Sequence, residues 1–259
     1  MMILTASMSD DIAASVFLLC WLGYGQVANW VALKRPSLVS AVRSFRHRWI
    51  ERICERENHT ADATLLSNLL RGALFFASTT VLILGGLVAL LGTAPKVAEV
   101  ISQLPYTTPK EPLLAEIKAL VLIFVYVYAF FKFTWSAWQY NVLSILVGAM
   151  PRPDSDAQLR SDYAEAAARV AALAGESYNN GVRAYYFSIP VMAWFIDPLL
   201  FLSATVVVTI VLYRREFYSP ILIALRESWT CKRCIAYGGG FGSCFWRPRR
   251  CTHGLRHQR

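Results

Sequence analysis

Charged residues are scarce in this 259-residue sequence: they make up 17% of it, whereas hydrophobic residues make up 56%. Soluble domains usually contain about a quarter charged residues and roughly 45–50% hydrophobic ones. The shortage of charge and the high apolar fraction argue against a chain that is disordered throughout and against an ordinary soluble domain. We therefore looked first for segments long enough to cross a lipid bilayer.

The motifs that usually mark an enzyme are also missing. The sequence contains no Ser/His/Asp set, no dinucleotide-binding fingerprint and no phosphate-binding loop, because the glycine run at 238–242 lacks the Lys-Ser/Thr that would complete one. His47 and His59 have no metal-ligand partner at helical spacing. We therefore predict a protein that is not an enzyme and has no cofactor.

The net charge of +9 is concentrated near one end of the sequence. Residues 1–213 hold 16 Lys and Arg against 15 Asp and Glu, whereas residues 214–259 hold 10 against 2. A nearly neutral body gives no reason to expect a nucleic-acid partner. We divide the chain into a transmembrane helical domain at 1–228 and a basic, Cys-rich, disordered tail at 229–259.

The tail contains residue types that bind zinc, although we predict no metal site. The candidate ligands are Cys231, Cys234, Cys244, Cys251 and His253. The first two have the Cys-x-x-Cys spacing of zinc sites, but the remaining spacing matches no common zinc finger.

Four apolar segments are long enough to span a bilayer, at about 12–33, 72–92, 113–135 and 184–213. Each must be helical, because unpaired backbone groups are costly in lipid. Two acidic residues, Asp10 and Asp11, precede the first segment where a signal peptide would have Lys or Arg, so we expect an uncleaved helix. The predicted fold class is an all-α integral membrane helical bundle.

Lys and Arg counts predict the orientation. The 34–64 loop contains seven such residues and the 93–112 loop only two, so we expect the first of these in the cytoplasm and the N-terminus outside. Four crossings then place the C-terminus outside, although Arg214 and Arg215 begin its most basic stretch. A fifth crossing over 133–150, beyond Lys132, would remove the conflict. Five polar residues make that span poor, so we favour four crossings and keep five as an alternative.

Two loop segments predict amphipathic cytoplasmic helices. In the 34–64 loop, apolar residues recur every three or four positions: Leu38, Val42, Phe45, Trp49, Ile50 and Ile53. This basic helix could lie on anionic lipid or pack on neighbouring helices. A weaker pattern over 155–178 predicts a second helix that ends at Asn179–Gly181. Together they could form a cytoplasmic layer.

Asp197 is the first candidate functional residue. It lies about midway between Arg183 and Arg214 in the fourth apolar segment, close to Pro190 and Pro198. An ionisable group at mid-depth in a bilayer is costly and often functional. The alternatives are a proton or cation relay at Asp197, or an offset helix that leaves it at the outer interface.

A second candidate is a polar cluster at the cytoplasmic ends of the spans. Arg71, Lys132 and Arg183 mark these ends, and Gln139 and Asn141 lie near them in sequence. Such a cluster could bind an anionic lipid headgroup or ligand. The alternative is that the basic residues are only topological anchors.

Several sequence blocks together resemble the family of uncharacterised membrane proteins called domain of unknown function 599. They are LLSNLLRGALFFASTT at 65–80, FKFTWS at 131–136, QYN at 139–141, NNGVRAYYF at 179–187 and VLYRREF at 211–217. The resemblance covers about residues 10–225. It implies a multi-pass bacterial membrane protein of about four helices with no assigned activity.

These observations predict a non-enzymatic scaffold or interaction protein of the bacterial inner membrane. Its expected partners are the bilayer, anionic headgroups at the cytoplasmic face and a second copy of the chain, packed through small residues such as Gly85 and Ala89. One alternative is a small ion or solute transporter that uses Asp197. Another is a membrane-embedded enzyme that acts on lipid.

Overall fold

The computed structural model describes residues 2–35, 37–92 and 112–225. These segments contain no strand and form the helices α1 (Met2–Lys34), α2 (Leu38–Ile53), α3 (Thr60–Gly92), α5 (Pro112–Gly148), α6 (Ala157–Trp194) and α7 (Pro198–Phe217). α1, α3, α5 and α7 each contain a stretch long and apolar enough to cross a membrane. The prediction of an all-α helical membrane bundle is confirmed.

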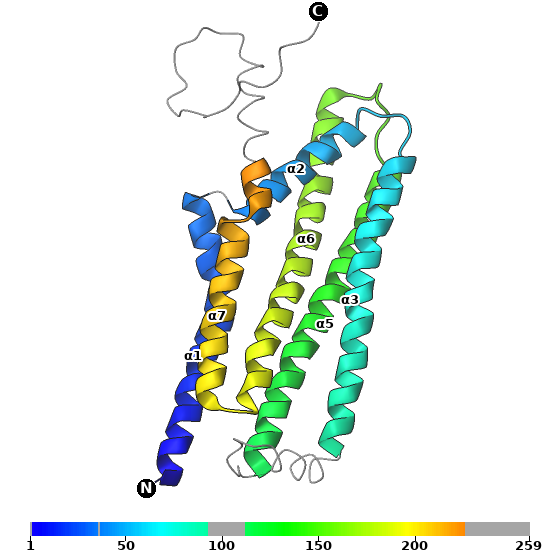
Figure 1. Cartoon of the computed structure of the whole chain (residues 1–259). Helices are drawn as coiled ribbons and strands as arrows, with labels where there is room; N and C mark the ends of the chain where they lie inside the picture. The colour runs from blue at the N-terminus through cyan, green and yellow to red at the C-terminus, as the bar shows by residue number, and fades with distance from the viewer. Residues whose placement is uncertain (1, 36, 93–111, 226–259) are drawn as a thin grey trace, which may run out of the picture.

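Five long helices lie alongside one another, and α2 crosses one end of the bundle (Figure 1). α1, α5 and α7 run in one direction, and α3 and α6 run in the other. The α5–α6 connection and the end of α7 lie at the same end as α2, which we call the α2 end. The N-terminus and the α6–α7 turn lie at the opposite end, which we call the N-terminal end.

α6 is the central helix of the bundle, since it packs against α2, α5 and α7. Its first half is rich in buried small residues, namely Ala164, Ala167, Ala168, Ala171, Ala174 and Gly175. Small side chains allow neighbouring helices to approach closely. At Gly175 the approach is so close that the Arg46 guanidinium lies where a β-carbon would stand.

The expected continuous helix over 184–213 is wrong. α6 ends at Trp194, and α7 begins at Pro198 and runs back along it (Figure 1). Asp197 is the N-cap of α7: its carboxylate accepts hydrogen bonds from the backbone N–H groups of Leu199 (2.7 Å) and Leu200 (3.3 Å). An Asp N-cap followed by Pro at the first helical position is a favoured helix start, which explains the break.

The alternative prediction, in which residues 133–150 form a separate fifth crossing, is also wrong. α5 is one helix from Pro112 to Gly148, so the chain does not reverse at Lys132. The bundle nevertheless has five long helices, because the reversal at Asp197 divides the fourth apolar segment into parts of two helices.

The first amphipathic loop helix is confirmed as α2. Ser37 is its N-cap and forms a capping box with Ser40. Ile50 and Ile53 are fully buried among residues of α3, α5 and α6, so the apolar face packs on protein rather than on a lipid surface. α2 packs against the first half of α6, so the two predicted loop helices lie together at the α2 end.

The predicted end of the second loop helix at Asn179–Gly181 is wrong, because α6 continues through Gly181 to Trp194. Gly181 is buried, and atoms of the Phe133 ring lie 2.8 Å from the position that a β-carbon would occupy. The glycine therefore serves a close contact between α6 and α5 and does not end the helix.

The longest helices exceed the thickness of a bilayer. α1, α3, α5 and α6 have 33, 33, 37 and 38 residues. At a rise of 1.5 Å per residue they are about 50 to 57 Å long, against about 30 Å for a hydrocarbon core. One end of the bundle can therefore extend well beyond a membrane.

Candidate functional site

The residues of the predicted polar cluster do not meet at one point. Arg71 and Asn141 are exposed on α3 and α5. Lys132 is half-buried, with its ammonium 5.4 Å from the centre of the Tyr128 ring. Gln139 is buried, and its amide lies 3.0 Å from the Ser177 hydroxyl of α6. Arg183 alone among the five lines a cavity described below.

Asp197 is not at mid-depth in a helix. It is exposed in the turn at the N-terminal end, and one oxygen of its carboxylate, Oδ1, accepts both N-cap hydrogen bonds. The relay hypothesis placed Asp197 about midway along one continuous span, whereas the structure places it in the turn between α6 and α7.

Arg183 is the centre of a buried polar cluster that joins three helices. Its Nη2 donates to both carboxylate oxygens of Glu216 on α7, at 3.0 and 2.9 Å. Its Nη1 donates to Asn180 Oδ1 at 3.2 Å. The Tyr24 hydroxyl of α1 donates to Glu216 Oε2 at 3.0 Å, and the guanidinium lies 5.2 Å from the centre of the Tyr24 ring. The ion pair thus connects α1, α6 and α7.

A second buried ion pair lies towards the N-terminal end. The Lys118 ammonium of α5 is 3.5 Å from Asp10 Oδ1 of α1, and it donates to the Trp194 carbonyl at 2.9 Å. The Trp194 indole N–H donates to the same Asp10 oxygen at 2.5 Å. The side chains of Lys118 and Asp10 are only 2% and 7% exposed, so this pair is a structural connection between α1, α5 and α6.

Sequence analysis did not identify Glu216 or Lys118 as site residues. Each pairs with a residue on another helix, far away in sequence, so no local spacing indicates the contact. One available indication was Glu216 itself, since it is an acidic residue directly after Arg214 and Arg215.

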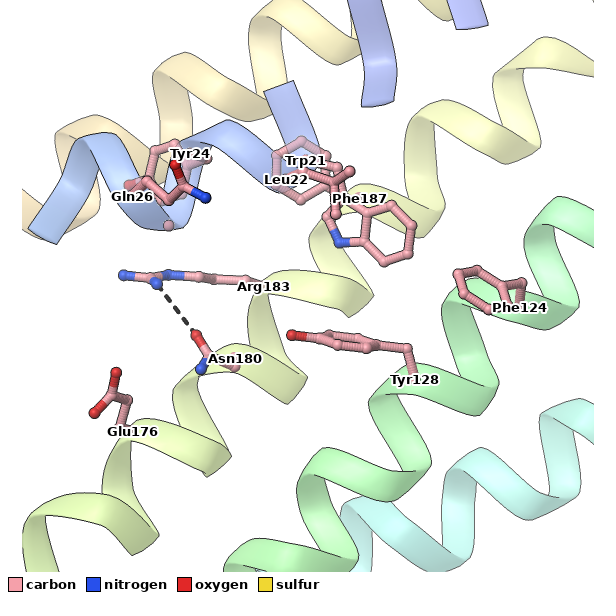
Figure 2. Close-up of a pocket in the computed structure, with 11 residues that line it drawn as sticks. Trp21, Leu22, Tyr24, Gln26, Phe124, Tyr128, Glu176, Asn180, Arg183 and Phe187 are labelled. Atoms are coloured by element: carbon pink, nitrogen blue, oxygen red, sulfur yellow. Dashed lines mark hydrogen bonds between the residues drawn. The ribbon is translucent and has the colours of Figure 1, made fainter. Parts of the chain in front are cut away.

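Beside Arg183 lies a crevice of about 460 Å³ between α1, α5 and α6 (Figure 2). α1 contributes Trp21, Leu22, Tyr24, Gly25 and Gln26; α5 contributes Phe124 and Tyr128; α6 contributes Glu176, Asn180, Arg183 and Phe187. Aromatic rings and Leu22 line much of it, and carboxylate, amide and guanidinium groups line the remainder. Such a mixture suits an amphiphilic ligand.

Trp21 of α1 lines the crevice and reaches across to α5. Its indole makes edge contacts with Phe124 and Tyr128, with ring centres 6.1 and 5.6 Å apart. Arg183 also lines a small cavity of about 40 Å³, together with Glu216 and Arg215. Arg183 therefore lines two hollow regions.

The thiol of Cys54 is a nucleophile that the structure places outside this crevice. It is buried at the α2 end, 3.7 Å from the Met150 sulfur. Burial raises the pKa of the Cys54 thiol, which lowers its reactivity at neutral pH. We interpret it as a packing residue.

The candidate zinc ligands Cys231, Cys234, Cys244, Cys251 and His253 lie outside the described residues. Within residues 2–35, 37–92 and 112–225, no group of three or more His, Cys, Asp or Glu side chains is placed to hold a metal ion.

A comparison with protein families finds a match over most of the chain. The model of a family described as "Protein of unknown function, DUF599" matches residues 12–221, which include every residue of the Arg183 cluster and the crevice. No curated protein and no solved structure matches the chain. The resemblance found in the sequence is confirmed, and the chain belongs to the DUF599 family.

Proposed function

We propose that this chain is a non-enzymatic scaffold of the bacterial inner membrane that crosses the bilayer five times. In this arrangement α1, α3, α5, α7 and the second half of α6 span the membrane. The α2 end lies in the cytoplasm, and the N-terminal end lies outside.

The observation that carries the proposal is the chain reversal at Asp197. It brings Arg214 and Arg215 to the same end of the bundle as Lys34, Arg35 and the basic residues of α2 (Figure 1). Cytoplasmic segments of membrane proteins are enriched in Lys and Arg. Five crossings thus remove the conflict that four crossings create at the C-terminal side.

The central position of α6 explains how a less apolar helix can be the fifth span. Its second half contains Arg183, and the neighbouring helices bury Ala184, Phe187 and Val191 of the same stretch. Arg183 pairs with Glu216, so its charge is compensated within the protein. Shielding by α1, α5 and α7 therefore makes the low hydropathy of α6 tolerable.

The scaffold surface would be the helical layer at the α2 end. The apolar face of α2 is covered by protein, and Arg43 and Arg52 on its other side are exposed. Such a basic surface suits contacts with anionic headgroups or with an acidic partner protein. The transporter alternative loses its premise, because Asp197 lies in a turn.

Labelling of single cysteines in intact cells tests the topology. In a cysteine-free background we would place one cysteine at Asn58, Ile196 or Tyr218, all exposed. A membrane-impermeant maleimide should label position 196 in intact cells, and positions 58 and 218 only after lysis. Labelling of position 218 in intact cells would overturn the five-crossing arrangement.

Site-specific photo-crosslinking tests the scaffold role. A photoreactive residue at Arg43 should form a discrete crosslinked protein product in cells. The matched position is Leu82, which is 77% exposed on the apolar surface of α3 and should crosslink to no protein at the same level. Equal yields at both positions would contradict a scaffold surface at the α2 end.

A further inference from the structure

Three polar residues of α6 follow one another along one wall of the crevice. Glu176, Asn180 and Arg183 are spaced i, i+4 and i+7, and Phe187 continues the row (Figure 2). Residues at this spacing share one face of a helix. From the α2 end inward, the wall therefore presents a carboxylate, an amide, a guanidinium and an aromatic ring.

The side chain of Arg183 brings its charge towards Glu176. Long side chains in helices point back towards the helix N-terminus, which for α6 is the α2 end. The hydrogen bond from Arg183 to Asn180, one turn earlier, agrees with this direction. The guanidinium thus lies at about the level of Asn180, roughly one helical turn from Glu176.

Arg183 retains hydrogen-bonding capacity in spite of its ion pair. Within the described part of the chain it makes three hydrogen bonds, to Glu216 and Asn180. A guanidinium has five N–H donors, so at least two remain for a ligand. Glu176 is exposed and its side chain makes no hydrogen bond or ion pair with any other described residue, so its carboxylate is available too.

The apolar part of the crevice is continuous with the outer surface of the bundle. Leu22 on α1 and Phe124 on α5 both line the crevice, and yet they are 66% and 63% exposed. Both belong to helices with membrane-length apolar stretches. An acyl chain could therefore enter between α1 and α5 directly from the lipid.

We propose that this crevice binds one phospholipid whose headgroup is a phosphate followed by a primary ammonium group. The ammonium would pair with Glu176, the phosphate with Arg183 and Asn180, and the first part of an acyl chain with Phe187 and Phe124. The order of these groups along α6 is the order in which they occur along such a lipid.

Size and charge agree with this assignment. A cavity of about 460 Å³ lies within the common range of ligand pockets, and it would hold the headgroup and the start of one chain. Arg183 pairs with Glu216, so the carboxylate of Glu176 is the remaining charge among the residues that line the crevice. A zwitterionic headgroup therefore adds no net charge beside Glu176 and offers it an ammonium group, whereas an anionic headgroup would bring a second negative charge close to it.

The inference rests on the proposed membrane embedding but does not depend on which end of the bundle faces the cytoplasm. It can be tested with the purified full-length chain, so its failure is distinguishable from a failure of the topology experiment. The probes are dilauroyl phosphatidylethanolamine and dilauroyl phosphatidylglycerol, which have equal chains, added to delipidated protein and followed by native mass spectrometry.

The wild-type chain should retain one molecule of the ethanolamine lipid about fivefold more tightly than the glycerol lipid, since one exposed ion pair makes the difference. Glu176→Gln should lower this preference to less than twofold. The matched control is Glu165→Gln, because Glu165 is an exposed acid of α6 outside the crevice that pairs with Arg169. The control should leave the preference unchanged.

Two further measurements distinguish the contribution of the headgroup to binding from that of the acyl chain. Phe124→Ala should weaken the binding of both lipids by a similar factor. Because Phe124 is exposed, we expect this variant to fold. Water-soluble glycerophosphoethanolamine should bind at least tenfold more weakly than the lipid, because it lacks the buried acyl contacts. Any one of three results would overturn the assignment. The wild type could retain both lipids equally, the preference could survive Glu176→Gln, or the soluble headgroup could bind as tightly as the lipid.

Discussion

Arg183 on α6 and Glu216 on α7 form an ion pair in the interior of the bundle, with Nη2 2.9 Å from Oε2. The side chains are 13% and 9% exposed, so neither charge is well solvated by water. The two residues are 33 positions apart in sequence and belong to antiparallel helices. The pair therefore fixes the relative register of α6 and α7 after the turn at Asp197.

Glu216→Gln should destabilise the protein strongly, because it leaves the Arg183 guanidinium buried without a counter-charge. We expect a loss of ~3 kcal/mol in the free energy of unfolding, measured by denaturant titration of the purified protein in detergent. Tyr24→Phe removes only one hydrogen bond to the same carboxylate and should cost ~1 kcal/mol. Equal costs for the two variants would show that the charge of Glu216 has no special importance.

Gly181→Ala should also destabilise the bundle, since a β-carbon at this position would lie 2.8 Å from atoms of the Phe133 ring. The expected cost is ~1–3 kcal/mol in the free energy of unfolding, because either the ring or the helix must move. Gly85→Ala is the matched control, as nothing lies within 4 Å of a β-carbon at Gly85. That variant should be neutral or stabilising, by up to ~1 kcal/mol. A neutral Gly181→Ala would mean that α5 and α6 are less closely packed than described.

The contact between Gly181 and Phe133 also explains one error of sequence-based prediction. Asn179-Asn180-Gly181 is a common pattern at helix ends, and local propensity predicts a stop there. The structure continues the helix because α5 packs against the glycine, and tertiary packing overrides a weak local preference.

The positions of the apolar segments could be predicted, because hydropathy depends on local sequence alone. The reversal at Asp197 was missed, although Asp197-Pro198 has the pattern of an N-cap followed by the first helical residue. Arg183 was identified as a candidate from its place at the end of an apolar segment. Its partner Glu216 was not, because contacts between helices have no signature in local spacing.

Asp197→Ala should affect stability rather than transport. The substitution removes the carboxylate that accepts the N–H groups of Leu199 and Leu200, so we expect a cost of ~1 kcal/mol in the free energy of unfolding. Asp197→Asn keeps an N-cap acceptor and should cost little. If Asp197→Asn instead abolished an ion flux that the wild type supports in liposomes, Asp197 would have a role beyond capping.

Because Asp10 and Lys118 form a buried ion pair, we expect the effects of substituting them on the free energy of unfolding to be non-additive. Lys118→Met leaves the Asp10 carboxylate without its cation, and Asp10→Asn leaves the ammonium without its anion, so each single variant should lose ~2–4 kcal/mol of unfolding free energy. The double variant removes both charges, and it should be more stable than the sum of the single losses predicts by at least ~1 kcal/mol. Denaturant titrations of the four proteins in one detergent measure this coupling. Additive losses would indicate that Asp10 and Lys118 do not interact, and that this ion pair does not hold α1 to α5.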